Sequence, residues 1–91
     1  MSEKVRKHIT FVGSVQGVGF RYTANYVANS LGLTGWVHNE WDGTVSMEVQ
    51  GTQEEIDRMI EMLNEGRFIS IERILVKNLP LDEDERRFHV R

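Results

Sequence analysis

Apolar residues recur along the chain with two different periods, and these periods predict where its helices and strands lie. Between residues 20 and 31 the apolar positions are three or four residues apart, which is typical of a helix with one buried face. These positions are Phe20, Ala24, Val27, Ala28 and Leu31. Gly32 follows directly, and glycine often ends a helix in a left-handed conformation. The pattern therefore predicts a helix from Phe20 to Leu31.

A second amphipathic helix is predicted after residue 52. Thr52 and Glu55 have the spacing of a capping box, in which both side chains satisfy backbone N–H groups at the start of a helix. The buried stripe of this helix consists of Ile56, Met59, Ile60 and Leu63. Gly66 is expected to end it.

Strands are predicted on either side of these helices. The first covers residues 7–13, the second about 35–41, the third about 44–50 and the fourth about 70–78. In the third, apolar and polar residues alternate strictly, as in a strand with one buried face. Phe88 and Val90 are expected to add a short last strand to the sheet.

The pair Asp42–Gly43 predicts a two-residue hairpin turn between the second and third strands. Such a turn places Asn39 opposite Ser46, and side chains alternate between the two faces of a strand. Asn39 is therefore expected to point away from the helix-covered core, where water reaches it. In the same register Trp36 faces the core, and the core side also receives His38 and Glu40.

The order of predicted elements is strand, helix, strand, strand, helix, strand and a short last strand. This order is typical of the ferredoxin-like fold, an α+β two-layer sandwich with two helices on one face of a mostly antiparallel sheet. The 91 residues are enough for one small core, and no linker or repeat divides them. A single domain is therefore expected over residues 1–91.

The composition of the chain limits its expected cellular location and binding partners. Apolar residues make up 40% of the chain and charged residues 27%, and the net charge of −3 gives no general attraction to nucleic acid. No apolar stretch approaches the roughly 20 residues that a membrane span needs, and no signal peptide is evident. Cysteine is absent, which excludes disulfides and thiolate chemistry. We expect a cytoplasmic monomer that binds neither nucleic acid nor membrane.

The stretch between the first strand and the first helix has the features of an anion-binding loop. It reads Ser14-Val15-Gln16-Gly17-Val18-Gly19-Phe20-Arg21. Glycine lets a backbone approach a ligand closely, and a loop entering a helix points its N–H groups outward beside the partial positive charge of the helix end. Arg21 adds a permanent cation with a planar set of donors. Residues 14–21 are therefore predicted to bind an anion, and phosphate fits best.

The run from Gln16 to Arg21 resembles the phosphate loop of the acylphosphatase family. The later run Gly35-Trp36-Val37-His38-Asn39, with Gly43, Val45 and Gly51 after it, resembles the second motif of that family at the right spacing. The resemblance covers nearly the whole chain, and its fold agrees with the one predicted from periodicity. Two residues depart from the family pattern, namely Phe11 before the loop and His38 before the motif asparagine, and neither removes a group that the chemistry needs.

The resemblance implies an enzyme that hydrolyses small acyl phosphates to a carboxylate and inorganic phosphate. It implies that Arg21 holds the phosphoryl oxygens and that Asn39 orients the attacking water. An acyl phosphate carries a good leaving group, so positioning and charge stabilisation supply most of the catalysis. No cofactor and no metal are expected.

Two other classes of function remain open from the sequence. Ferredoxin-like domains also bind RNA through strand aromatics, and the candidates here are Phe11, Trp36 and Trp41. A non-catalytic relative would bind phosphate in the loop without turning it over.

The three histidines, His8, His38 and His89, are scattered singly without the spacing of a metal site, and no Ser–His–Asp order is present. The acidic run Asp82–Glu85 is expected to be a solvated loop.

Overall fold

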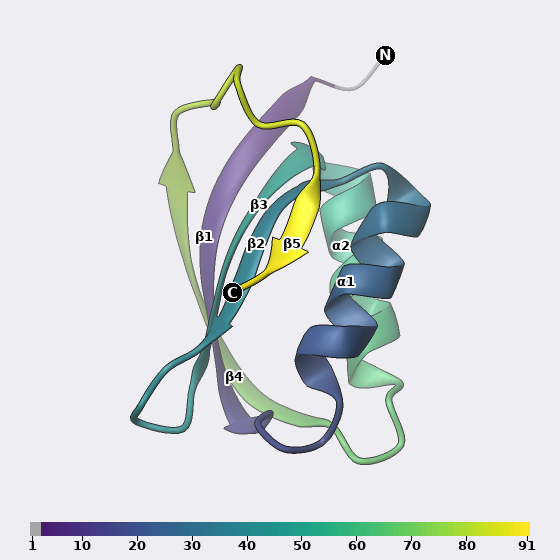
Figure 1. Cartoon of the computed structure of the whole chain (residues 1–91), viewed down its shortest axis with the longest axis vertical. Helices are drawn as coiled ribbons and strands as arrows, with labels where there is room; N and C mark the ends of the chain where they lie inside the picture. The colour runs from purple at the N-terminus through teal and green to yellow at the C-terminus, as the bar shows by residue number, and fades with distance from the viewer. Residues whose placement is uncertain (1–2) are drawn as a thin grey trace.

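The fold is a five-stranded sheet with two helices packed on one of its faces, as the computed structural model of residues 3–91 shows (Figure 1). In chain order the elements are β1 Lys4–Ser14, α1 Phe20–Leu31, β2 Thr34–Asn39, β3 Val45–Thr52, α2 Gln53–Asn64, β4 Ser70–Leu79 and β5 Phe88–Val90. Neither helix in this part of the chain is long and apolar enough to cross a membrane.

The sheet has the strand order β4-β1-β3-β2-β5. Its first four strands pair antiparallel, and β5 joins the edge beside β2 in the parallel direction. This is the ferredoxin-like α+β arrangement, so the predicted fold class is confirmed. Phe88 is buried against the helix layer, which explains why so short a last strand is held in place.

The helix layer buries the apolar stripes that the sequence predicts. In α1 the buried residues include Ala24 and Val27, and Gly32 caps the end of the helix in the left-handed conformation. In α2 the capping box between Thr52 and Glu55 forms, and the helix ends at Asn64, two residues before the predicted glycine. Between the layers the rings of Phe11 and Phe20 lie 4.9 Å apart, joining β1 to the start of α1.

The hairpin between β2 and β3 differs from the predicted two-residue turn. The Glu40 N–H donates to the Thr44 carbonyl at 2.9 Å, and the Gly43 N–H donates to the Glu40 carbonyl at 3.2 Å. The connection is therefore three residues long, from Trp41 to Gly43. Gly43 has a φ of 95°, the left-handed residue that such a loop needs to rejoin the strand.

This extra loop residue moves the register by one position and turns every side chain of β2 to the other face. Asn39 pairs with Val45 and not with Ser46, and it lies on the helix side of the sheet, as does the buried Val37. Trp36 and His38 lie on the open side. The prediction that Asn39 points away from the helix layer, with Trp36 in the core, is therefore wrong.

Charged and aromatic side chains cover the open face of the sheet. Arg6 bonds to Glu48 at 2.7 Å and to Glu85 at 3.0 Å, and His8 lies 2.9 Å from the other Glu48 oxygen. We expected the whole acidic run Asp82–Glu85 to be solvated, but Glu85 is bound to the sheet through Arg6. Trp36 lies beside this cluster, with its ring edge-on to that of His8.

Candidate active site

The loop from β1 into α1 leads into a helix start that has no side-chain cap. Gly17 and Gly19 have φ angles of 72° and 81°, which disfavour other residues, and a Cβ added to either would meet no atom within 4 Å. Gly19 is the N-cap of α1 and supplies no side-chain hydrogen bond to the first turn. The first N–H groups of α1 are therefore not capped by a side chain, as in helix ends that bind anions.

A cavity of about 180 Å³ lies at this helix start. Of the predicted loop residues, its lining includes Val15, Gly17, Gly19, Phe20 and Arg21, and it excludes Ser14, Gln16 and Val18. Asn39 and Tyr22 complete the lining. The structure thus brings together the two side chains to which the resemblance assigns the chemistry, and the loop and the hairpin lie at the same end of the sheet (Figure 1).

Arg21 is partly buried and is held by the last strand. Its Nη1 donates to the main-chain oxygen of Arg91 at 2.9 Å, directly after β5. Among the described residues no side-chain carboxylate forms an ion pair with Arg21. This hydrogen bond orients the guanidinium, whose other N–H donors can interact with an anion in the cavity.

Asn39 lies at the end of β2, where the corrected register points it toward the start of α1. Its Oδ1 is buried and accepts no hydrogen bond from the described residues. A buried amide oxygen without a protein donor normally binds water or a ligand. His38 lies on the opposite side of the sheet and does not line the cavity that contains Arg21 and Asn39.

Gln16 ties the loop to the hairpin, which the sequence did not reveal. Its Nε2 donates to the carbonyl oxygens of Glu40 at 2.6 Å and Thr44 at 2.8 Å. These two residues pair with each other at the base of the hairpin turn. A single side chain therefore fixes the strand end that carries Asn39 relative to the glycine loop. Its sequence separation from both partners left no local pattern to detect.

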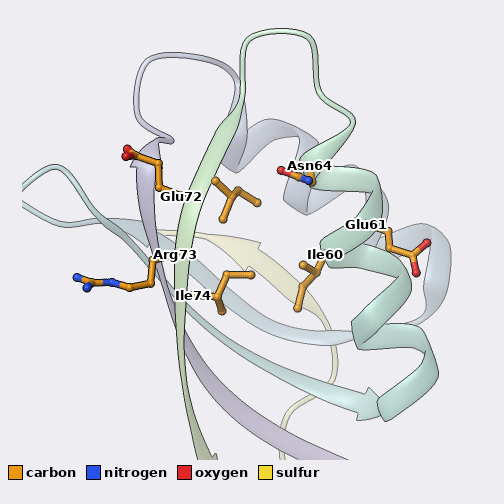
Figure 2. Close-up of a pocket in the computed structure, with 7 residues that line it drawn as sticks. Ile60, Glu61, Asn64, Glu72, Arg73 and Ile74 are labelled. Carbon is orange, nitrogen blue, oxygen red and sulfur yellow. The ribbon is translucent and has the colours of Figure 1, made fainter.

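Two larger hollows lack the character of a phosphate site. One of about 400 Å³ lies between α2 and β4, where Ile60 and Ile74 point toward one another and Arg73 points away (Figure 2). Its floor is apolar. The other, of about 680 Å³, lies on the open face. Its arginines are matched by as many carboxylates: Arg6, Arg86, Arg87 and Arg91 against Glu48, Asp82, Asp84 and Glu85.

The positions of the three candidate aromatic residues also argue against RNA binding. Phe11 is fully buried, and Trp41 stands 98% exposed at the tip of the hairpin, away from the sheet face. Trp36 is on the open face, but the Arg91 guanidinium lies 4.4 Å from its ring centroid and covers it. The three aromatics therefore do not form a stacking surface. No group of three or more His, Asp or Glu within residues 3–91 is arranged to hold a metal ion.

Comparison with known proteins gives a consistent result. The acylphosphatase family profile matches residues 7–90. An acylphosphatase of Bifidobacterium longum is 44% identical over 89 residues, spanning 96% of this chain and 92% of that protein. One from Geobacillus kaustophilus is 38% identical over 86 residues, spanning 93% and 92%. The crystal structure of acylphosphatase from Bacillus subtilis superposes with a TM-score of 0.85 at 32% identity, covering 94% of this chain and 97% of that one. The chain therefore belongs to the acylphosphatase family.

Proposed function

We propose that the cavity at the start of α1 is the active site in which this acylphosphatase hydrolyses acyl phosphates. In this proposal the N–H groups of residues 15–21 and the Arg21 guanidinium hold the phosphoryl oxygens, and Asn39 orients the attacking water. The observation that carries it is the buried, unpartnered Asn39 Oδ1, which shares one small cavity with Arg21 and the glycine loop.

The proposed reaction is a single displacement at phosphorus. The water oxygen forms a bond to phosphorus, and the bond between phosphorus and the acyl oxygen breaks, so that its electron pair leaves with the carboxylate. The proton of the water passes to a phosphoryl oxygen, and the products are a carboxylate and inorganic phosphate. Because a carboxylate is a stable leaving group, the site needs no side chain to protonate it.

The proposed roles follow from the charges that change during the displacement. Negative charge on the equatorial oxygens is stabilised by the guanidinium and by backbone N–H groups fixed in advance, and removing one such donor typically costs about 100-fold or more in rate. Asn39 is neutral and cannot act as a base. It contributes by holding the water in line with the bond that breaks.

Arg21→Ala tests the phosphate-binding role directly. We expect the variant to lose at least about 100-fold in kcat/KM for acetyl phosphate, because the main cationic donor is gone. The far-ultraviolet circular dichroism spectrum should remain unchanged. Arg58→Ala, at an exposed position of α2, is the matched control and should keep the parent activity. Parent-level activity in Arg21→Ala would show that phosphate binds elsewhere.

The proposal also covers nucleic-acid binding, oligomeric state and cellular location. The net charge of −3 argues against nucleic-acid binding, because it gives no general attraction to a phosphate backbone. A filter-binding assay with RNA would test this directly. We also propose a cytoplasmic monomer, for which size-exclusion chromatography and cell fractionation are the tests.

A further inference from the structure

The outer surface of α1 differs from that of α2 in charge. Residues 22–39 contain no Asp, Glu, Lys or Arg, in a chain where such residues make up 27%. The second helix has the same length of 12 residues and carries five charged side chains, Glu54, Glu55, Asp57, Arg58 and Glu61. An exposed helix face without charge is therefore a local feature of α1.

Two exposed tyrosines dominate this uncharged face. Tyr22 is 80% exposed and Tyr26 is 69% exposed, and their spacing of four residues places them on the same side of the helix. Together with Asn25, Asn29 and Ser30 they line a groove of about 420 Å³. Asn25 accepts a hydrogen bond from Asn29 at 3.2 Å, so the amides along the groove are mutually ordered. The surface thus offers aromatic rings and neutral amides.

This groove adjoins the proposed active site. Tyr22 lines both the groove and the 180 Å³ cavity that contains Arg21 and Asn39. The cavity is large enough for a phosphoryl group and little more, so the rest of a substrate must extend out of it. A neighbouring hollow that begins at Tyr22 is available to receive that part.

The geometry of the displacement favours the same direction. In an in-line reaction the leaving group departs on the side opposite the attacking water. Asn39, which would hold the water, belongs to the sheet and lies on its helix-facing side. The leaving carboxylate therefore points away from the sheet, toward the solvent side of α1 where Tyr22 is exposed.

We propose that the groove along α1 is the acyl subsite of the enzyme and that it selects acyl phosphates with an uncharged aromatic acyl group. This inference rests on the proposed function, since it assumes that the cavity holds the phosphoryl group. A planar ring attached to the reacting carboxyl stacks against Tyr22. A longer planar group extends about one helical turn further, to Tyr26. An anionic acyl group finds no cation in this groove.

The test compares benzoyl phosphate with acetyl phosphate, because both share the reacting group and only the first carries a ring. In Tyr22→Ala the ratio of kcat/KM for benzoyl phosphate to that for acetyl phosphate should fall about fivefold, mainly through a higher KM for benzoyl phosphate. Tyr22→Phe keeps the ring and should keep the parent ratio. Leu75→Ala removes an exposed apolar side chain on the opposite face of the sheet and is the control, with the ratio unchanged.

The second tyrosine is tested with 4-phenylbenzoyl phosphate, whose outer ring reaches further along the helix. Tyr26→Ala should lower kcat/KM for this substrate more than for benzoyl phosphate. If Tyr22→Ala leaves the benzoyl-to-acetyl ratio at the parent value while both substrates are hydrolysed, the acyl subsite lies elsewhere and the proposed function stands. If the parent protein hydrolyses neither substrate, both the subsite and the proposed function fail.

Discussion

At the scale of single residues, the position of Asn39 decides what its side chain can do. Its amide lies on the helix side of the sheet and shares a cavity with Arg21. Had the hairpin contained the predicted two-residue turn, the same side chain would point toward the open face, away from the glycine loop. The difference of one residue in the turn therefore separates an amide that can orient a water in the cavity from one that cannot.

Asn39→Ala should separate water orientation from phosphate binding. We expect kcat for acetyl phosphate to fall at least about 100-fold, since the attacking water loses its fixed partner. The inhibition constant of inorganic phosphate should change little, because in the proposed site the loop and Arg21 hold that anion. Asn64→Ala, at the exposed end of α2, is the control. Equal losses in kcat and in phosphate affinity would instead identify Asn39 as a phosphate ligand.

The sequence predicted two side chains that share the cavity, Arg21 and Asn39, better than it predicted their surroundings. Arg21 and Asn39 were predicted because they belong to short motifs in which neighbouring residues specify the pattern. Tyr22 was missed, since an exposed tyrosine on a helix has no local signal until its neighbouring cavity is known. Gln16 was predicted only as a loop residue, and its hydrogen bonds to the hairpin depend on contacts 24 and 28 residues away in sequence.

At the scale of elements, periodicity predicted every helix and strand but not the pairing of β2. Trp36 and Val37 are adjacent and both apolar, so alternation alone allows either of them to face the core. The predicted register already contained a conflict, because it placed His38 and Glu40 on the core side. The three-residue turn removes that conflict for His38, which is exposed. Turn length, and not the strand pattern, was the quantity that the sequence left undetermined.

Gln16 joins two elements, and its replacement should affect both stability and rate. In Gln16→Leu the carbonyls of Glu40 and Thr44 lose a shared donor at a partly buried position, which should lower the free energy of unfolding by about 2 kcal/mol. The value of kcat should also fall, because the hairpin is no longer fixed relative to the loop. Urea denaturation and acetyl phosphate assays measure these effects.

Two further variants sharpen this experiment. Gln16→Glu retains the size of the side chain but places acceptors against two carbonyl oxygens, so it should be at least as damaging as Gln16→Leu. Gln53→Leu removes an exposed hydrogen bond to Asp57 on α2 and should change stability by no more than about 0.5 kcal/mol. If Gln16→Leu behaved like Gln53→Leu, the link between loop and hairpin would have no mechanical role.

At the scale of the whole molecule, the ionic cluster on the open face connects distant parts of the chain. Burial acts to raise the pKa of Glu48, but the hydrogen bonds from His8 and Arg6 outweigh it and leave this pKa below its usual value. Arg6 also bonds to Glu85, which in turn accepts a hydrogen bond from Thr34. The cluster therefore fastens the connection before β5 to the strands β1, β2 and β3.

The lowered pKa of Glu48 makes part of the stability dependent on pH. A carboxylate with a lowered pKa stabilises the folded state above its unfolded value, near 4.5, and this contribution is lost as the pH falls through the folded value. Glu48→Gln should therefore be about 1 kcal/mol less stable than the parent at pH 7. The difference should be smaller at pH 3 than at pH 7. Denaturation at both pH values measures it.

Glu61→Gln is the control for this effect, since Glu61 is exposed on α2. Its stability difference from the parent should be small and should not vary with pH in the same way. A constant difference between the parent and Glu48→Gln at both pH values would mean that the cluster contributes through packing and not through charge. No local sequence pattern reveals this cluster, because the residues that bond to one another in it are 40 to 79 positions apart.

The hydrogen bond between Arg21 and the main chain of Arg91 has a consequence for folding during synthesis on the ribosome. The two residues are separated by 70 positions. At ribosomal speeds of about 5–20 residues per second, roughly 4–14 s pass between the addition of the arginine and that of its anchor. A nascent polypeptide can thus contain the whole glycine loop while the guanidinium is still unrestrained. If Arg21 binds phosphate as proposed, full phosphate affinity should therefore develop only when β5 docks on the sheet.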